Sequence, residues 1–152
     1  MKRIKPKRNV NPTPAKTKVR TSTMPNSGKG LFAEQDIKKG EPIAMIVGPV
    51  YTEAELKNIV RDEYILEDVC GTRFIDVEGP ARYANDARGL TRVPGVNNNS
   101  AFLAYEDGTL WLESTKKIKA GEEIFVAYGK QYWKEIKQRI DAQNAQPKRS
   151  SK

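Results

Sequence analysis

The chain has 152 residues, enough for one domain of ordinary size, and carries 27 Lys and Arg against 19 Asp and Glu, a formal net charge of +8. The excess lies at the two ends. Residues 1–20 hold eight basic residues and no acidic one, and residues 148–152 add three more basic residues. Residues 21–147 carry 16 basic and 19 acidic residues, a net charge of −3. A basic arm and a basic tail therefore flank a slightly acidic central part.

The side-chain inventory excludes several kinds of site, because histidine is absent and Cys70 is the only cysteine. Without them the chain has no His-based acid–base catalysis, no Ser–His or Cys–His nucleophile pair and no intrachain disulfide, and we expect no metal site. Cys70 is expected to be a packing residue, with thiol chemistry as the alternative. The longest apolar run, 43–47, is too short to span a bilayer, so we expect a soluble intracellular protein without membrane partners.

Short apolar runs separated by turn signals predict that most of the central part is β-structure. The predicted strands are at residues 31–33, 42–50, 72–77, 100–105, 109–113 and 123–128. Glu106-Asp107-Gly108 stands between two of these runs and indicates a hairpin, because Gly and Asp tolerate the positive φ of tight turns.

Two helices and two flexible ends complete the prediction. Thr52 and Glu55 have capping-box spacing, which predicts a helix over 53–62. Apolar residues at helical spacing over 131–145, including Trp133, predict an amphipathic C-terminal helix that folds back on the sheet. The arm 1–20 and the tail 147–152 are expected to be disordered.

A long polar loop over 82–99, which ends in three consecutive asparagines, interrupts the β-rich pattern. Long loops inside compact domains are more often functional than idle. Periodicity alone thus predicts a single, mainly β domain with two helices, and it assigns no activity.

Three separated blocks supply a resemblance. They are residues 27–33 (SGKGLFA) with 37–41 (IKKGE), residues 82–87 (RYANDA), and residues 118–124 (IKAGEEI), which lead to Ala127-Tyr128-Gly129. In this order and spacing the blocks resemble the motifs of SET-domain protein-lysine N-methyltransferases. The resemblance implies a β-clip-like SET domain of small sheets with a pseudoknot over 21–133, with one short internal helix, and a C-terminal helix over 134–146 that packs on it.

The sequence departs from this family in three places. Asp86 stands where His is usual, Ala87-Arg88 replaces Ser-Cys, and the Cys-rich zinc-binding flanks of many family members are absent. The Asp86 carboxylate is expected to bring negative charge close to the site. The helix that contains Tyr132 and Trp133 is expected to replace the missing C-terminal zinc module; Trp133 is either a core residue or an adenine platform.

The resemblance implies S-adenosylmethionine as the cofactor. Gly28, Lys29 and Gly30 would cradle its methionine part, because a turn without Cβ atoms lets a ligand approach the backbone, and the Lys29 side chain would lie near the carboxylate. The Asn85 side chain would hold the ammonium group, and the backbone of Asn85 and Asp86 would meet the adenine edge. The alternatives are a plain turn at 28–30 and a plain loop turn at 85–86.

Tyr128 is the predicted catalytic residue and is also assigned to the cofactor site. Methyl transfer to an amine is an in-line displacement that needs alignment and a neutral lysine. An apolar channel and the nearby sulfonium charge both lower the lysine pKa, so no histidine is required. Tyr64 and Phe102 are predicted to line this substrate channel. The alternative for Tyr128 is an aromatic core residue at the end of a strand.

The leading hypothesis is therefore an S-adenosylmethionine-dependent protein-lysine methyltransferase, located in the nucleus, that acts on a basic protein such as a histone tail in chromatin. The acidic central part favours a basic substrate electrostatically. Two alternatives stay open. One is a catalytically inactive SET-fold binding module, and the other is a nucleic-acid-binding protein that acts through basic residues 2–20.

Overall fold

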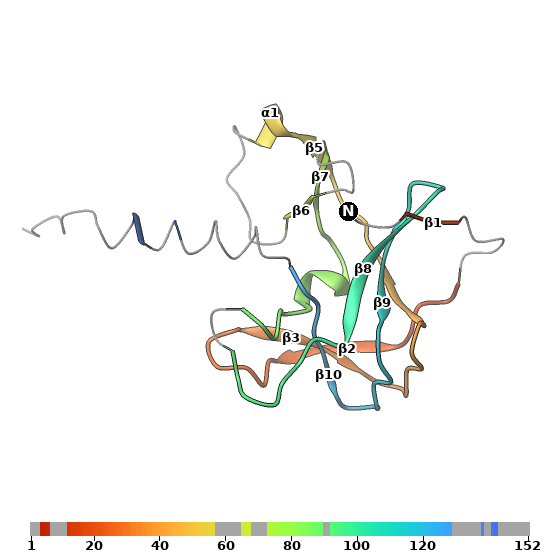
Figure 1. Cartoon of the computed structure of the whole chain (residues 1–152), viewed down its shortest axis with the longest axis vertical. Helices are drawn as coiled ribbons and strands as arrows, with labels where there is room; N and C mark the ends of the chain where they lie inside the picture. The colour runs from red at the N-terminus through yellow and green to blue at the C-terminus, as the bar shows by residue number, and fades with distance from the viewer. Residues whose placement is uncertain are drawn as a thin grey trace, which may run out of the picture.

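A computed structural model describes residues 4–6, 12–56, 65–67, 73–89, 92–128, 138 and 141–142. Most of the predicted C-terminal helix lies outside these residues, as do Tyr64, Cys70, Tyr132 and Trp133. The described strands form three small sheets that do not close into a barrel, which confirms the prediction of a mainly β fold with small sheets (Figure 1).

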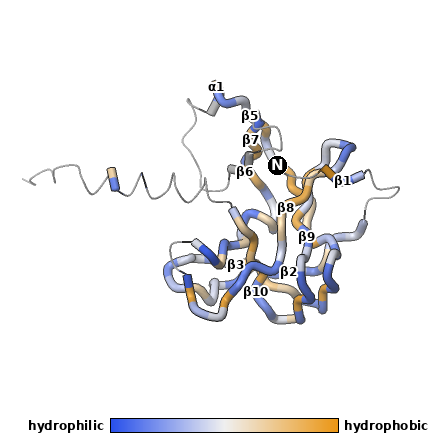
Figure 2. Tube along the Cα trace, in the orientation of Figure 1, coloured by the Kyte–Doolittle hydropathy of each residue, from blue (hydrophilic) through white to orange (hydrophobic). Residues whose placement is uncertain are grey.

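The largest sheet has four strands in the order β1-β8-β9-β4. Its members are β1 (Ile4–Lys5), β4 (Pro42–Met45), β8 (Ser100–Tyr105) and β9 (Leu110–Ser114). β8 and β9 form the predicted hairpin, in which Gly108 has a φ of 85°. Figure 2 shows hydrophobic residues along β8 and β9 and hydrophilic residues at the turn between them.

Two three-stranded sheets flank it, in the orders β10-β3-β2 and β5-β7-β6. The first contains β2 (Thr17–Thr21), β3 (Lys29–Ala33) and β10 (Glu123–Ile124). The second contains β5 (Val50–Thr52), β6 (Ile65–Glu67) and β7 (Arg73–Asp76). A short α1 (Glu53–Leu56) follows β5, and a 3₁₀ helix, η1 (Pro80–Tyr83), follows β7.

The predicted capping box is present at the start of α1. The Thr52 hydroxyl accepts a hydrogen bond from the Glu55 backbone N–H at 3.2 Å, and the Glu55 carboxylate accepts one from the Thr52 N–H at 3.4 Å. The rest of the helix predicted over 53–62 lies outside the described residues.

The expectation of a disordered arm over 1–20 is wrong at Ile4–Lys5, which pair with β8, and at its last residues. β2 pairs with β3 along its whole length, from Thr17 opposite Ala33 to Thr21 opposite Lys29. Thr17 and Val19 face inward and are half-buried, whereas Lys18 and Arg20 are exposed. The high positive charge led to the expectation of disorder, but Lys18 and Arg20 both lie on the outer side of an edge strand whose other face is half-buried.

Two predicted strands are shorter than expected. The strand predicted over 42–50 ends at Met45, because the chain turns at Gly48, which has a φ of 147°. A Cβ at Gly48 would lie 1.9 Å from the Asp76 carbonyl oxygen, so only glycine permits this approach. The strand predicted over 123–128 keeps two residues in a sheet and then continues as single bridges.

The main core lies between the sheets. Its largest fully buried side chains come from strands of two of the sheets and from the turns between strands: Leu31, Ile37, Ile43, Leu112, Ile118, Ile124 and Val126. Isolated bridging of Ile37 with Ile118 brings two of the turns together inside this core.

Leu112→Ala should lower the free energy of unfolding by about 2–5 kcal/mol, because the side chain is fully buried and its removal leaves a cavity. Urea denaturation followed by tryptophan fluorescence would measure this. Exposed Lys117→Ala is the control and should stay within about 0.5 kcal/mol of wild type. Equal stability of the two variants would contradict the placement of Leu112 in the core.

Candidate functional site

The segment after β10 lies between two stretches of the long polar loop. On one side the Phe125 carbonyl accepts hydrogen bonds from the backbone N–H groups of Asn99, at 3.1 Å, and Ser100, at 3.0 Å. On the other side the Val126 N–H donates to the Asn85 carbonyl at 2.8 Å. The closing motif is therefore bracketed by both ends of the loop predicted to be functional.

The Asn99 side chain continues this bracketing. Its Oδ1 accepts the Phe125 N–H at 2.8 Å, and its Nδ2 donates to the Glu123 carbonyl at 3.0 Å. A side-chain amide carries one acceptor and a donor group, like a peptide unit, so Asn99 pairs with the closing segment as a neighbouring strand would. This explains one member of the asparagine run.

Glu123 joins the closing motif to the other two blocks. Its side chain is 6 % exposed and its carboxylate accepts hydrogen bonds from four donors. The donors are the Ser22 hydroxyl (2.7 Å), the Thr23 N–H and hydroxyl (2.7 Å each) and Asn85 Nδ2 (3.4 Å). Charge-assisted bonds of this kind compensate the cost of burying a carboxylate.

The glycine turn lies directly against this carboxylate. A Cβ at Gly30 would fall 2.4 Å from Glu123 Oε2, so this position requires glycine for a reason internal to the protein. Gly28 has a φ of 62° and no heavy atom within 4 Å of an added Cβ, so its outer side is open. Lys29 is exposed and its carbonyl accepts a hydrogen bond from Asn85 Nδ2 at 3.0 Å.

Asn85 thus contacts both the glycine turn and Glu123 through its amino group. Within the described part of the chain its Oδ1 accepts no hydrogen bond. The half-buried Asn85 amide oxygen can accept hydrogen bonds from an ammonium group, and the exposed Lys29 side chain can bind a carboxylate. These residues therefore fit the methionine part of S-adenosylmethionine.

The Asp86 carboxylate, which is expected to bring negative charge close to the site, is bonded to the closing segment and to the loop around it. It is 5 % exposed, and its Oδ2 accepts the Tyr128 backbone N–H at 2.9 Å. Its Oδ1 accepts Asn98 Nδ2 and the Arg88 N–H, each at 2.9 Å. The carboxylate is thus engaged by groups of the protein.

Tyr128 is half-buried at the end of the closing segment, and its hydroxyl donates a hydrogen bond to the Ala84 carbonyl. It is partly buried and also packs against the main core. Phe102 lies in β8 opposite Leu112 and packs partly buried against the same core. The structure thus brings Tyr128 to the Asn85 loop, and Tyr64 lies outside the described residues.

Five polar residues around this site were not predicted as site residues: Ser22, Thr23, Asn98, Asn99 and Glu123. The Glu pair of the closing motif and the asparagine run indicated three of these positions in the sequence. Ser22 and Thr23 had no comparable signal, since their role depends on a contact with a residue about 100 positions later.

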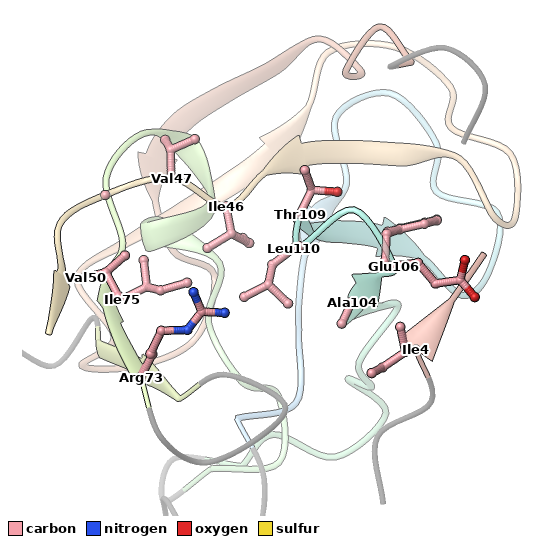
Figure 3. Close-up of a pocket in the computed structure, with 13 residues that line it drawn as sticks. Ile4, Ile46, Val47, Val50, Arg73, Ile75, Ala104, Glu106, Thr109 and Leu110 are labelled. Carbon is pink, nitrogen blue, oxygen red and sulfur yellow. The ribbon is translucent and has the colours of Figure 1, made fainter. Parts of the chain in front are cut away.

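A cavity of about 370 Å³ lies away from this network, beside the turn between β8 and β9 (Figure 3). Its wall is mostly apolar and includes the exposed side chains Ile4, Val47 and Val50. Residues of the three motif blocks do not line it. Among the residues described, no cluster of three or more acidic or cysteine side chains could hold a metal ion. Nor does any helix in the described ranges have the length and apolar composition to cross a membrane.

These features define a β-rich domain whose site is assembled from a glycine turn, an asparagine loop and a closing Glu–Tyr segment. The SET domain family model matches residues 28–129, more than half of the chain. The chain therefore belongs to the SET domain family, and the resemblance of its three blocks is confirmed. Members that are methyltransferases use S-adenosylmethionine, in agreement with the expected cofactor. A comparison with curated proteins finds no match.

Solved structures agree with this fold. The chain is similar to the crystal structure of Chaetomium thermophilum polycomb repressive complex 2, with 21% identity, a TM-score of 0.62, and coverage of 77% of this chain and 16% of that one. It is also similar to ctPRC2 bound to S-adenosylmethionine, with 21% identity, a TM-score of 0.62, and coverage of 87% of this chain and 17% of that one. A third similar structure is ctPRC2 in complex with H3K27me3 and H3K27M, with 22% identity, a TM-score of 0.64, and coverage of 77% and 15%. At these identities the likeness shows the fold, and this chain spans about a sixth of the length of those chains.

Glu123→Gln should lower the free energy of unfolding by about 1–3 kcal/mol, because every partner of the carboxylate is a donor and an amide nitrogen would face one of them. Chemical denaturation would measure the change. The exposed neighbour offers a matched control, since Glu122→Gln should stay within about 0.5 kcal/mol of wild type. A Glu123 variant as stable as its control would show that the buried network does not hold the site together.

Proposed function

We propose that this protein is an S-adenosylmethionine-dependent protein-lysine N-methyltransferase. The observation that carries the proposal is the convergence on residues 84–86: Asn85 contacts the glycine turn, and Ala84 and Asp86 both bind Tyr128. The Asn85 amide, which we propose binds the methyl donor, and the Tyr128 phenol are thereby both fixed at residues 84–86. Membership of the SET domain family supports the same activity.

The proposed roles follow from the geometry of these groups. Asn85 Oδ1 binds the donor's ammonium group, and the exposed Lys29 ammonium binds its carboxylate. When bound, the cofactor supplies a methyl group on a sulfonium. The Tyr128 hydroxyl donates to the Ala84 carbonyl, so its oxygen is presented as an acceptor that orients the substrate amine. Orientation of this kind lowers the barrier of an in-line displacement without a histidine base.

The proposed substrate is a basic protein segment, such as a histone tail, and the proposed location is the nucleus. The net charge of −3 over residues 21–147 supports a cationic partner. The solved structures support it as well, since one of them is ctPRC2 in complex with H3K27me3 and H3K27M. Phe102 and Tyr64 remain the proposed walls of the lysine channel.

Tyr128→Phe should lower methyl transfer by about 10²-fold or more, since it removes the hydroxyl that orients the amine. Transfer of tritiated methyl from S-adenosylmethionine to core histones and to a lysine peptide library would measure this. Tyr51→Phe is the control and should keep wild-type activity, since the half-buried Tyr51 lies in β5 opposite Phe74. Equal activity of the Tyr128 variant and wild type would refute the assignment.

Asn85→Ala should weaken binding of S-adenosylmethionine by about tenfold or more, because the variant loses the amide acceptor and its contacts to the turn. Isothermal titration calorimetry would measure the dissociation constant, with thermal unfolding as the check on folding. Absence of binding by wild type at high micromolar donor would favour the inactive binding module. Binding of DNA that is lost when the basic residues of 2–20 are changed to glutamine, which leaves the chain of β2 in place, would favour the nucleic-acid alternative.

A further inference from the structure

We propose that Asp86 is a positioning residue that fixes Tyr128 relative to Asn85, an inference that rests on the proposed methyltransferase function. Asp86 stands where the resembled family usually has histidine. Its carboxylate is 5 % exposed and accepts the Tyr128 backbone N–H at 2.9 Å. It therefore acts on the phenol through the backbone.

The other carboxylate oxygen prevents Asp86 from turning. Oδ1 accepts Asn98 Nδ2 and the Arg88 N–H, each at 2.9 Å, and Asn98 Oδ1 in turn accepts the Ala87 N–H at 2.8 Å. Asn98 thus joins the Asp86 side chain to the backbone beside it. The whole arrangement is a ring of hydrogen bonds closed within residues 86–98, and Tyr128 is attached to it.

Tyr128 is consequently held at two atoms by residues 84–86, once through a side chain and once through a backbone carbonyl. Its N–H binds Asp86, and its hydroxyl binds the carbonyl of Ala84, two residues earlier. Asn85, between them, is the proposed donor-binding amide. The two attachments set the separation between the hydroxyl and this amide, and a loss of the Asp86 attachment would let the end of the closing segment shift.

Aspartate suits this position because the three hydrogen-bonding groups described above, the N–H groups of Tyr128 and Arg88 and Asn98 Nδ2, are all donors. Asparagine offers a single acceptor oxygen, and its amino group would face a donor. A neutral imidazole also offers one acceptor. Asp86→Asn should therefore weaken the attachment of Tyr128 in part, and Asp86→Ala should remove it.

The test combines amide hydrogen exchange with kinetics. Asp86→Ala should raise the exchange rate of the Tyr128 amide by about tenfold or more and lower kcat by about 10²-fold, with the dissociation constant of S-adenosylmethionine within about threefold of wild type. Asp107→Ala is the matched control. Asp107 accepts the Thr109 N–H at 3.0 Å in the exposed β8–β9 turn, so its loss should leave the Tyr128 amide and kcat unchanged.

Unchanged protection of the Tyr128 amide in Asp86→Ala would overturn the proposal, as would an unchanged kcat. If Asp86→Ala does not fold, Asp86→Asn serves in its place, with unchanged exchange or kcat again counting against the proposal. Absence of methyl transfer by wild type would instead refute the proposed function. The exchange measurement separates the two failures, since it reports on the Asp86–Tyr128 bond without any turnover.

Discussion

The buried carboxylate of Glu123 is the constraint on which the site depends. A charged group can be this deeply buried only if donors surround it, and the four donors come from residues 22–23 and from Asn85. This requirement brings together the turn that connects β2 and β3, the polar loop and the closing segment. It also explains Gly30, since any side chain there would occupy the space of the carboxylate. Glycine at position 30 is therefore required for packing within the protein, independently of any ligand.

Side-chain amides perform a second structural task around this carboxylate. The closing segment has only two residues in a regular sheet, yet it is bonded on both sides over the next residues. Asn99 provides the bonds that a further strand would have provided, and Asn98 does the same for the turn at Asp86. A short polar side chain can bond to backbone groups where a strand cannot fit, so the closing segment is paired on both sides without additional secondary structure.

Local signals in the sequence predicted the local structure well. The β8–β9 hairpin followed from a turn that contains Gly108, and the capping box from the spacing of Thr52 and Glu55. The three motif blocks predicted which segments meet, because the family resemblance carries long-range information that periodicity lacks. β2 was missed since its charges resemble those of a disordered arm. The network of Ser22 and Thr23 was missed because two hydroxyls in a turn become partners of Glu123 only after the chain has folded.

The hydrogen bond from Ser22 to Glu123 spans 101 positions in the sequence, and Asn85 meets Lys29 across 56. Contacts of such separation form only after long loops have closed, which slows folding relative to domains of similar size with local contacts. A nascent chain cannot complete this site until nearly the whole domain has left the ribosome. A fragment that ends before the closing segment lacks Glu123 and Tyr128 and therefore cannot form the complete network.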